Sequence, residues 1–313
     1  MSSKTFTITC LILVALNIYL FASAPPPLAE EKPAGTTISI QQVFAIVEAE
    51  NDAVRALWTR EIVGSGKKVG LKFNEDWREQ GVEAGPLPAL FLRETAMSLE
   101  KRPARLSLFL GSEYPINKAN RFEGIQLEKF QHLKQTREPQ FFFARDTGLY
   151  TAMYTDEATV EPCVECHNEH KQSPRNDWKI HDVMGATTWM YPSDQVTFDE
   201  SMKILTALRQ GFRDTYTSYL KKVGTFANQP AIGEKWPREG YFLPATDIFM
   251  TEITRRTSAQ TLAALAKAVQ PLANTELVIP AYAPDLKSQP AQTALFSPPQ
   301  LSAANANVIP PNR

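Results

Sequence analysis

The chain has 313 residues, of which 43 % are hydrophobic and 10 % aromatic, and a formal net charge of -1. This length and apolar content allow a well-buried core and exclude a chain that is disordered throughout. The charge argues against a nucleic-acid-binding protein, and three cysteines are too few for a disulfide scaffold. We therefore expect a globular protein of one or two domains.

The N-terminus carries an export segment. Residues 5–24 are uncharged and long enough to cross a bilayer as a helix, so residues 1–24 are predicted to be a membrane anchor. A cleaved signal peptide is the alternative, because the run ends in a small-x-small pattern, although Pro25 disfavours cleavage. The lysine before the run and the glutamates after it place the rest of the chain on the periplasmic side of the cytoplasmic membrane. Residues 25–39 form a proline-rich linker.

A long amphipathic helix is predicted next. Apolar residues recur at steps of three and four from Ile40 to Ile62, which makes one stripe on a helix of about six turns. Glu50 and Asn51 interrupt this stripe, and they indicate either a water-facing stretch or a pocket opposite the helix. A loop with several glycines and prolines then leads to a second helix over residues 89–100.

The middle of the chain has the alternation of β-strands. Strands are predicted from residue 105, in two runs around a hairpin turn at residues 145–148, and over residues 183–191, with a helix over residues 122–136. This order predicts an α+β domain with a mainly antiparallel sheet over residues 40–192.

The C-terminal third is predicted to be helical. Thr197 and Glu200 form a capping-box pattern that opens a helix to about Val223, and a further helix follows from Asp247 to Val269. The helical region, residues 193–270, either docks a partner or extends the core. The tail, residues 271–313, is rich in proline and nearly uncharged, and we predict disorder. No internal repeat is apparent.

The stretch CVECHNEH, residues 163–170, concentrates the soft metal ligands of the exported part of the chain. Cys-x-x-Cys-His is the spacing of covalent c-type haem: Cys163 and Cys166 would form thioethers to the porphyrin, and His167 would be an axial ligand of the iron. A zinc site with His170 and His181, a redox dithiol and a plain disulfide are the alternatives. Two thiols at this spacing directly before a histidine favour one haem c.

The second axial ligand of such a haem is not fixed by the motif. His170 follows His167 too closely to reach the other face of the porphyrin. The candidates in the rest of the chain, beside an open or water-filled position, are His132, His181, Met97, Met153 and Met184.

The haem motif and its surroundings resemble a family of exported PAS-like domains that carry one c-type haem, long described as a domain of unknown function. Asn168, Pro174, Trp178 and Gly185 are among the shared positions, which extend over roughly residues 40–192. The resemblance implies a five-stranded antiparallel PAS-like sheet, a long N-terminal helix, and haem between sheet and helices. In the best-known member a cysteine thiolate of that helix is the other ligand. This chain has no cysteine between Cys10 and Cys163, so the thiolate is not carried over.

Two functions follow from these features. The first is a membrane-anchored periplasmic monohaem protein that acts as a redox or small-gas sensor and signals to a protein partner. The alternative is an electron-transfer cytochrome with a redox partner, in which both axial positions would be filled. A peroxidase-like enzyme is not predicted, because the sequence offers no distal acid–base residues that we can assign.

Overall fold

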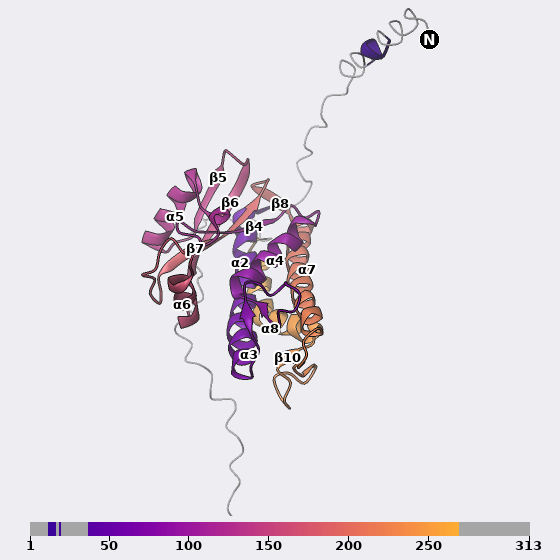
Figure 1. The fold of residues 1–313 in the computed structure, drawn as a ribbon. Coiled ribbons are helices and arrows are strands. Elements are labelled where there is room, and N and C mark those ends of the chain that lie inside the picture. The colour runs from indigo at the N-terminus through magenta and orange to yellow at the C-terminus, as the bar shows by residue number, and fades with distance from the viewer. Residues whose placement is uncertain (1–11, 17–18, 20–36, 269–313) are drawn as a thin grey trace, which may run out of the picture. The chain divides into compact units, whose positions relative to one another are not determined.

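The structure is a computed structural model that describes residues 12–16, 19 and 37–268. Most of the predicted anchor, the linker up to residue 36 and the predicted disordered tail lie outside this part. Among the helices of the described residues, none is long and apolar enough to span a bilayer. The α+β class predicted from the sequence is confirmed (Figure 1).

The long N-terminal helix follows a short strand, β1 (Thr37–Ser39), and has three consecutive segments: α2 (Ile40–Ala56), the π-helical η1 (Leu57–Gly64) and α3 (Ser65–Lys68). Ser39 and Gln42 form a capping box at its start, which satisfies backbone N–H groups that the first turn leaves free. The predicted helix is confirmed, and it continues past Ile62 to Lys68. The parallel pair β2 (Phe73–Asn74) and β3 (Gly85–Pro86) and the helix α4 (Pro88–Glu100) follow.

The main sheet has four antiparallel strands in the order β4-β7-β6-β5: β4 (Ser107–Gly111), β5 (Gln140–Ala144), β6 (Leu149–Glu157) and β7 (Val183–Tyr191). This is one strand fewer than the resemblance implies, since the described chain between β4 and β5 forms the helices η2 (Lys118–Asn120) and α5 (Gly124–Thr136). Gly185 allows β4 and β7 to approach, because a Cβ there would lie 2.5 Å from the carbonyl oxygen of Gly111.

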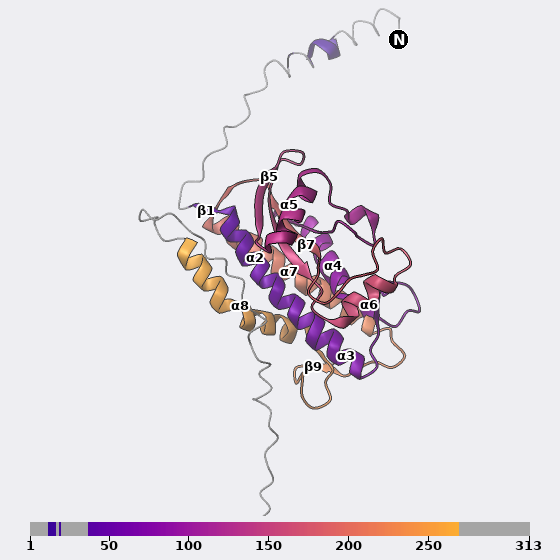
Figure 2. The same cartoon turned by 90° about the vertical axis from the view of Figure 1, so that its left-hand side faces the viewer.

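The two faces of this sheet are covered by different helices. Met153 of β6 belongs to the hydrophobic cluster under α5, whereas its neighbour Ala152 and the opposite residue Trp189 belong to the main core with α2. Figure 1 shows α5 and α2 on opposite sides of the sheet, and Figure 2 shows the same elements turned by 90°. The side chains of β6 and β7 therefore alternate between α5 and the long N-terminal helix.

The two predicted C-terminal helices are confirmed as α7 (Phe198–Val223) and α8 (Thr246–Ala268). The strands β8 (Gln195–Thr197), β9 (Ile232–Gly233) and β10 (Leu243–Pro244) precede or connect them. Helix α8 contacts α2, and α7 contacts α4. All four helices contribute buried side chains to one hydrophobic core, so α7 and α8 extend the core.

Residues 37–100 and 195–268 repeat the same order of elements: a strand, a long helix, a short parallel strand pair and a second helix. The strands β1 and β8 that begin the two segments pair with each other. Each connecting loop has the pattern Glu-x-Trp-x-x-x-Gly, which ends at Gly81 (φ 81) and Gly240 (φ 77). The aromatic stack of Trp58 on Phe91 recurs as the stack of Tyr216 on Phe249. The expectation of no internal repeat is therefore wrong.

Candidate functional site

The Cys-x-x-Cys-His motif lies on a short helix, α6 (Glu161–Glu169), that follows β6. Cys163 and Cys166 are three residues apart, so their side chains lie on the same face of the helix. Both thiols are free and partly buried, and burial raises the pKa of each thiol above its usual value. The site therefore holds two protonated thiols one helical turn apart.

His167 follows the second cysteine and is half-buried. Its ring lies edge-on to Trp178, with 6.5 Å between the ring centroids, and its Nδ1 atom has no hydrogen-bond partner. Burial lowers the pKa of His167, because the charged imidazolium loses solvation there. A neutral imidazole with a lone pair is the form that binds a metal ion.

Asn168 fixes the loop that follows the motif. Its Oδ1 accepts a hydrogen bond from the backbone N–H of Trp178 at 2.8 Å, and its Nδ2 donates to the carbonyl oxygen of Trp178 at 3.0 Å. The guanidinium of Arg175 lies over the Trp178 ring at 3.9 Å. These contacts hold the indole beside His167, which gives a structural reason for Asn168 and Trp178 in the motif region.

The structure brings one of the five candidate axial ligands to the motif. Met184 is buried in a small hydrophobic cluster that Cys163 contacts, with Ala158, Val164 and Trp178. The other four candidates lie elsewhere: His132, Met97 and His181 are exposed, and Met153 is buried under α5 with Phe122 and Phe130.

The zinc alternative receives no support from the described residues, which contain no group of three or more His, Cys, Asp or Glu side chains that could hold a metal ion. His170 instead contacts Glu75, with 3.2 Å between Nε2 and Oε1. His181 is exposed, and its backbone N–H donates to the carbonyl oxygen of Ala158 at 2.9 Å. The free thiols also differ from the disulfide alternative.

Charged side chains of the long N-terminal helix and its loop lie near α6. Arg55 of α2 and Asp156 of β6 act electrostatically on Cys163, and Lys67 of α3 and Glu75 act on Cys166. The π-helical segment η1 lies between Arg55 and Lys67. Such segments are frequent at functional sites.

The two polar residues that interrupt the apolar stripe of α2, Glu50 and Asn51, are both buried, so the expectation of a water-facing stretch there is wrong. Glu50 is fully buried, but it belongs to an ion pair with Arg209 of α7 and accepts a hydrogen bond from Thr261 of α8 at 2.9 Å. The polar group that faces the sheet was missed and consists of Glu48, Asp52 and Arg55, with Asn51 beside it. Its signal is the spacing of charged residues at four and three positions along one helix face.

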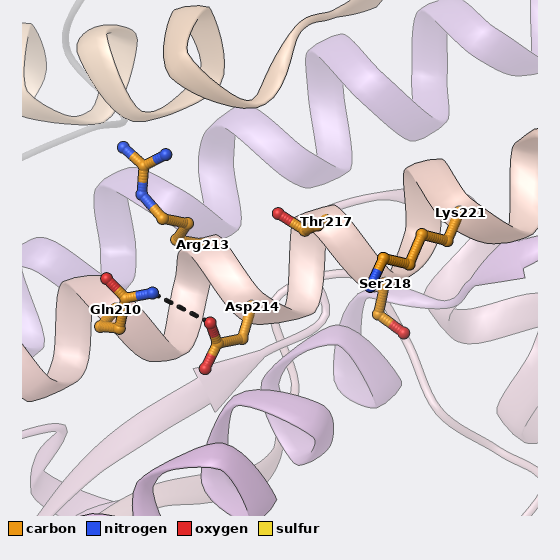
Figure 3. A pocket seen from close by; sticks show the side chains of 6 residues that line it. All are labelled: Gln210, Arg213, Asp214, Thr217, Ser218 and Lys221. Carbon is orange, nitrogen blue, oxygen red and sulfur yellow. Dashed lines mark hydrogen bonds between the residues drawn. The ribbon is translucent and has the colours of Figure 1, made fainter.

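A surface pocket of about 390 Å³ is lined by α7 alone and contains no residue of the motif (Figure 3). Asp214 in this pocket accepts hydrogen bonds from Gln210 at 3.0 Å and from Ser98 at 2.8 Å. Arg213 in this pocket forms an ion pair with Asp247 of α8, so Asp214 and Arg213 are both paired and we assign the pocket no chemistry.

The long N-terminal helix, the sheet and the motif helix all lie in one stretch of the sequence. Residues 37–192 match the model of the Tll0287-like domain family. This is a domain family of unknown function. The matched region ends after β7, so α7 and α8 lie outside it. No curated protein and no solved structure matches the chain.

Proposed function

We propose that the chain is a membrane-anchored periplasmic protein that carries one covalently bound haem c in its Tll0287-like domain. Cys163 and Cys166 would form the thioether bonds, and His167 would be an axial ligand of the iron. The observation that carries this proposal is the geometry of α6, with two free thiols one turn apart and a neutral, half-buried imidazole beside them. When bound, the haem would supply one-electron chemistry and an axial position at the iron.

Within this proposal, a redox or small-gas sensor is the main function. Arg55 of α2 and Lys67 of α3 act electrostatically on the two cysteines of the motif helix, and His170 contacts Glu75 in the loop after β2. A change of charge or ligand at the iron would therefore act on a helix that follows the predicted anchor. The partner would be a redox or signalling protein.

An electron-transfer cytochrome is the second candidate, and Met184 is the observation that favours it. This methionine is buried in the cluster that contacts Cys163. A thioether ligand from Met184 would close the second axial position, as electron carriers require for small reorganisation.

The haem itself is tested by expressing the full chain with a c-type haem maturation system and extracting the purified protein with acidified acetone. We expect the haem to stay with the protein, and to be lost when Cys163 and Cys166 are both replaced by serine. His170→Gln is the matched control and keeps its haem, since His170 has no assigned role at the iron. Complete extraction of haem from the unaltered protein would contradict the proposal.

The two candidate functions are separated by carbon monoxide binding to the reduced protein. Rapid binding to the unaltered protein indicates an open position and a sensor of small ligands. Absence of binding, with binding restored in Met184→Leu, indicates methionine ligation and electron transfer. Leucine has a similar volume, so this variant tests ligation without a large cavity.

A further inference from the structure

A buried carboxylate faces the sheet from α2 without a cation of its own. Glu48 is 6 % exposed and accepts a hydrogen bond from the indole Nε1 of Trp189 at 2.5 Å. Asn51 Nδ2 donates to the same carboxylate oxygen at 3.4 Å. Both donors are neutral, so they stabilise the carboxylate less than a guanidinium would.

Two further carboxylates and one cation complete this group. Asp52 lies on the next turn of α2, and Asp156 comes from β6. Arg55 forms an ion pair with Asp156, and its other terminal nitrogen donates to Thr187 Oγ1 at 3.4 Å. One guanidinium thus faces three carboxylates in a partly buried region, which is the arrangement in which like charges favour a bound proton.

The electrostatics agree with this geometry. Burial, followed by the charge of Asp52, raises the pKa of Glu48 well above its usual value. Burial also raises the pKa of Asp52 to about 6, against the lowering effect of Arg55. At neutral pH the group therefore holds a proton that exposed carboxylates would release.

Two buried polar atoms near these carboxylates have no hydrogen-bond partner. They are the hydroxyl of Tyr154 on β6 and Oδ1 of Asn51. Burial, followed by the charge of Glu48, raises the pKa of Tyr154, so its hydroxyl stays protonated.

The cations on the other elements that pack against the long helix are engaged elsewhere. Arg209 of α7 forms an ion pair with Glu50, and Arg256 of α8 forms one with Glu61. Neither arginine therefore forms an ion pair with Glu48.

The group is electrostatically connected to the haem motif. Asp156 acts on both Cys163 and His167, and Arg55 acts on Cys163. The same strand, β6, carries Tyr154 and Asp156 and leads into α6. A charge added at the motif would therefore be felt by the carboxylates through the low dielectric of the interior.

We propose that Glu48 and Asp52 form a proton-binding site that takes up one proton when one electron is added to the haem held by α6. The inference rests on the proposed function. The electron would come from a one-electron reductant, and the proton would come from a hydronium ion of the solvent, whose O–H bond breaks as the O–H bond on a carboxylate oxygen forms. No covalent bond other than this O–H bond forms, and the net charge of the region stays the same.

The test is a spectroelectrochemical titration of the haem-loaded full chain with redox mediators, from about pH 5 to about pH 8. Uptake of one proton per electron means that a tenfold fall in proton concentration lowers the midpoint potential by about 59 mV. In the unaltered protein we expect a slope that approaches this value above about pH 6, where Asp52 is ionised before reduction, and a flatter slope below it. In the double variant Glu48→Gln with Asp52→Asn we expect a flat profile.

Glu61→Gln is the matched control, because Glu61 lies on the same long helix and is paired with Arg256. It keeps the slope of the unaltered protein. Covalent haem with a pH-independent potential, or an unchanged slope in the double variant, overturns the inference and leaves the proposed function standing. A protein without covalent haem overturns the proposed function, and the inference with it.

If the double variant does not fold, a second measurement on the unaltered protein tests the same inference. Infrared difference spectra of the unaltered, haem-loaded protein compare the reduced and oxidised states at neutral pH. Growth of a protonated-carboxyl band on reduction supports the proton site. A spectrum without any change in that region overturns it.

Discussion

Two buried glutamates on opposite faces of α2 have very different partners. Glu50, on the face toward α7 and α8, receives a hydrogen bond from Arg209 Nε at 2.8 Å and one from Thr261 at 2.9 Å. Glu48, on the face toward the sheet, receives hydrogen bonds from Trp189 and Asn51, both neutral. Burial is common to both, so the two carboxylates differ in the charge of the partner, which is a guanidinium at Glu50 and two neutral donors at Glu48.

The largest expected effect comes from breaking the paired face. Arg209→Met leaves Glu50, which is 0 % exposed, without its guanidinium. We expect the free energy of unfolding at neutral pH to fall by about 3 kcal/mol, because an unpaired buried charge remains. Urea denaturation followed by circular dichroism measures it.

Arg213→Met is the matched control on the same helix. Arg213 pairs with Asp247, whose side chain is 83 % exposed, so its loss should cost less than about 0.5 kcal/mol. Equal effects of the two variants would mean that the Glu50 pair contributes no more than a surface pair, and the contrast between the two faces would disappear.

A substitution on the face of α2 toward the sheet should raise the free energy of unfolding, whereas Arg209→Met lowers it. The pKa of Asp52 is about 6 in the folded protein and about 3.9 in an unfolded chain, so the folded state binds the proton more tightly. Its contribution to stability is full below about pH 4 and is lost as the pH rises through about 6. Asparagine does not ionise, so Asp52→Asn does not lose stability as the pH rises. We expect this variant to be more stable than the unaltered protein by on the order of 1–2 kcal/mol near pH 8.

The measurement is urea denaturation of Asp52→Asn and the unaltered protein near pH 4 and near pH 8. The difference between them should be small at the lower pH and favour the variant at the higher pH. A variant that is less stable by the same amount at both pH values would show that the charge of Asp52 does not cause the effect.

The elements of the fold were largely predictable because their signals are local. The apolar periodicity after Ile40 and the capping pattern at Thr197 gave two long helices, and the turn at Gly148, with φ 70, gave the hairpin of β5 and β6. The candidate haem residues Cys163, Cys166 and His167 were selected from the Cys-x-x-Cys-His spacing alone. The helical conformation of the motif was not anticipated.

The contacts that distinguish the two faces of α2 were not predictable, because they join residues far apart in the sequence. Glu48 and its donor Trp189 are 141 residues apart, and Arg55 and Asp156 are 101 apart. The internal repeat was missed for a related reason. Its core positions exchange one aromatic residue for another, as at Trp58 and Tyr216, so the common packing leaves few identical residues.

The smallest expected effect concerns the exposed contact between Glu75 and His170, which joins the loop after α3 to the motif helix. Glu75 is 48 % exposed, so Glu75→Gln should change the free energy of unfolding by less than about 0.5 kcal/mol at neutral pH, and by less still in high salt. Thermal unfolding at low and high ionic strength measures this. A loss above about 1 kcal/mol would mean that an exposed pair fixes α6 against the long helix. A charged partner would then contribute to the free energy of unfolding at the surface as well as in the interior. The contrast between Glu48 and Glu50 would then not require that the two carboxylates are buried.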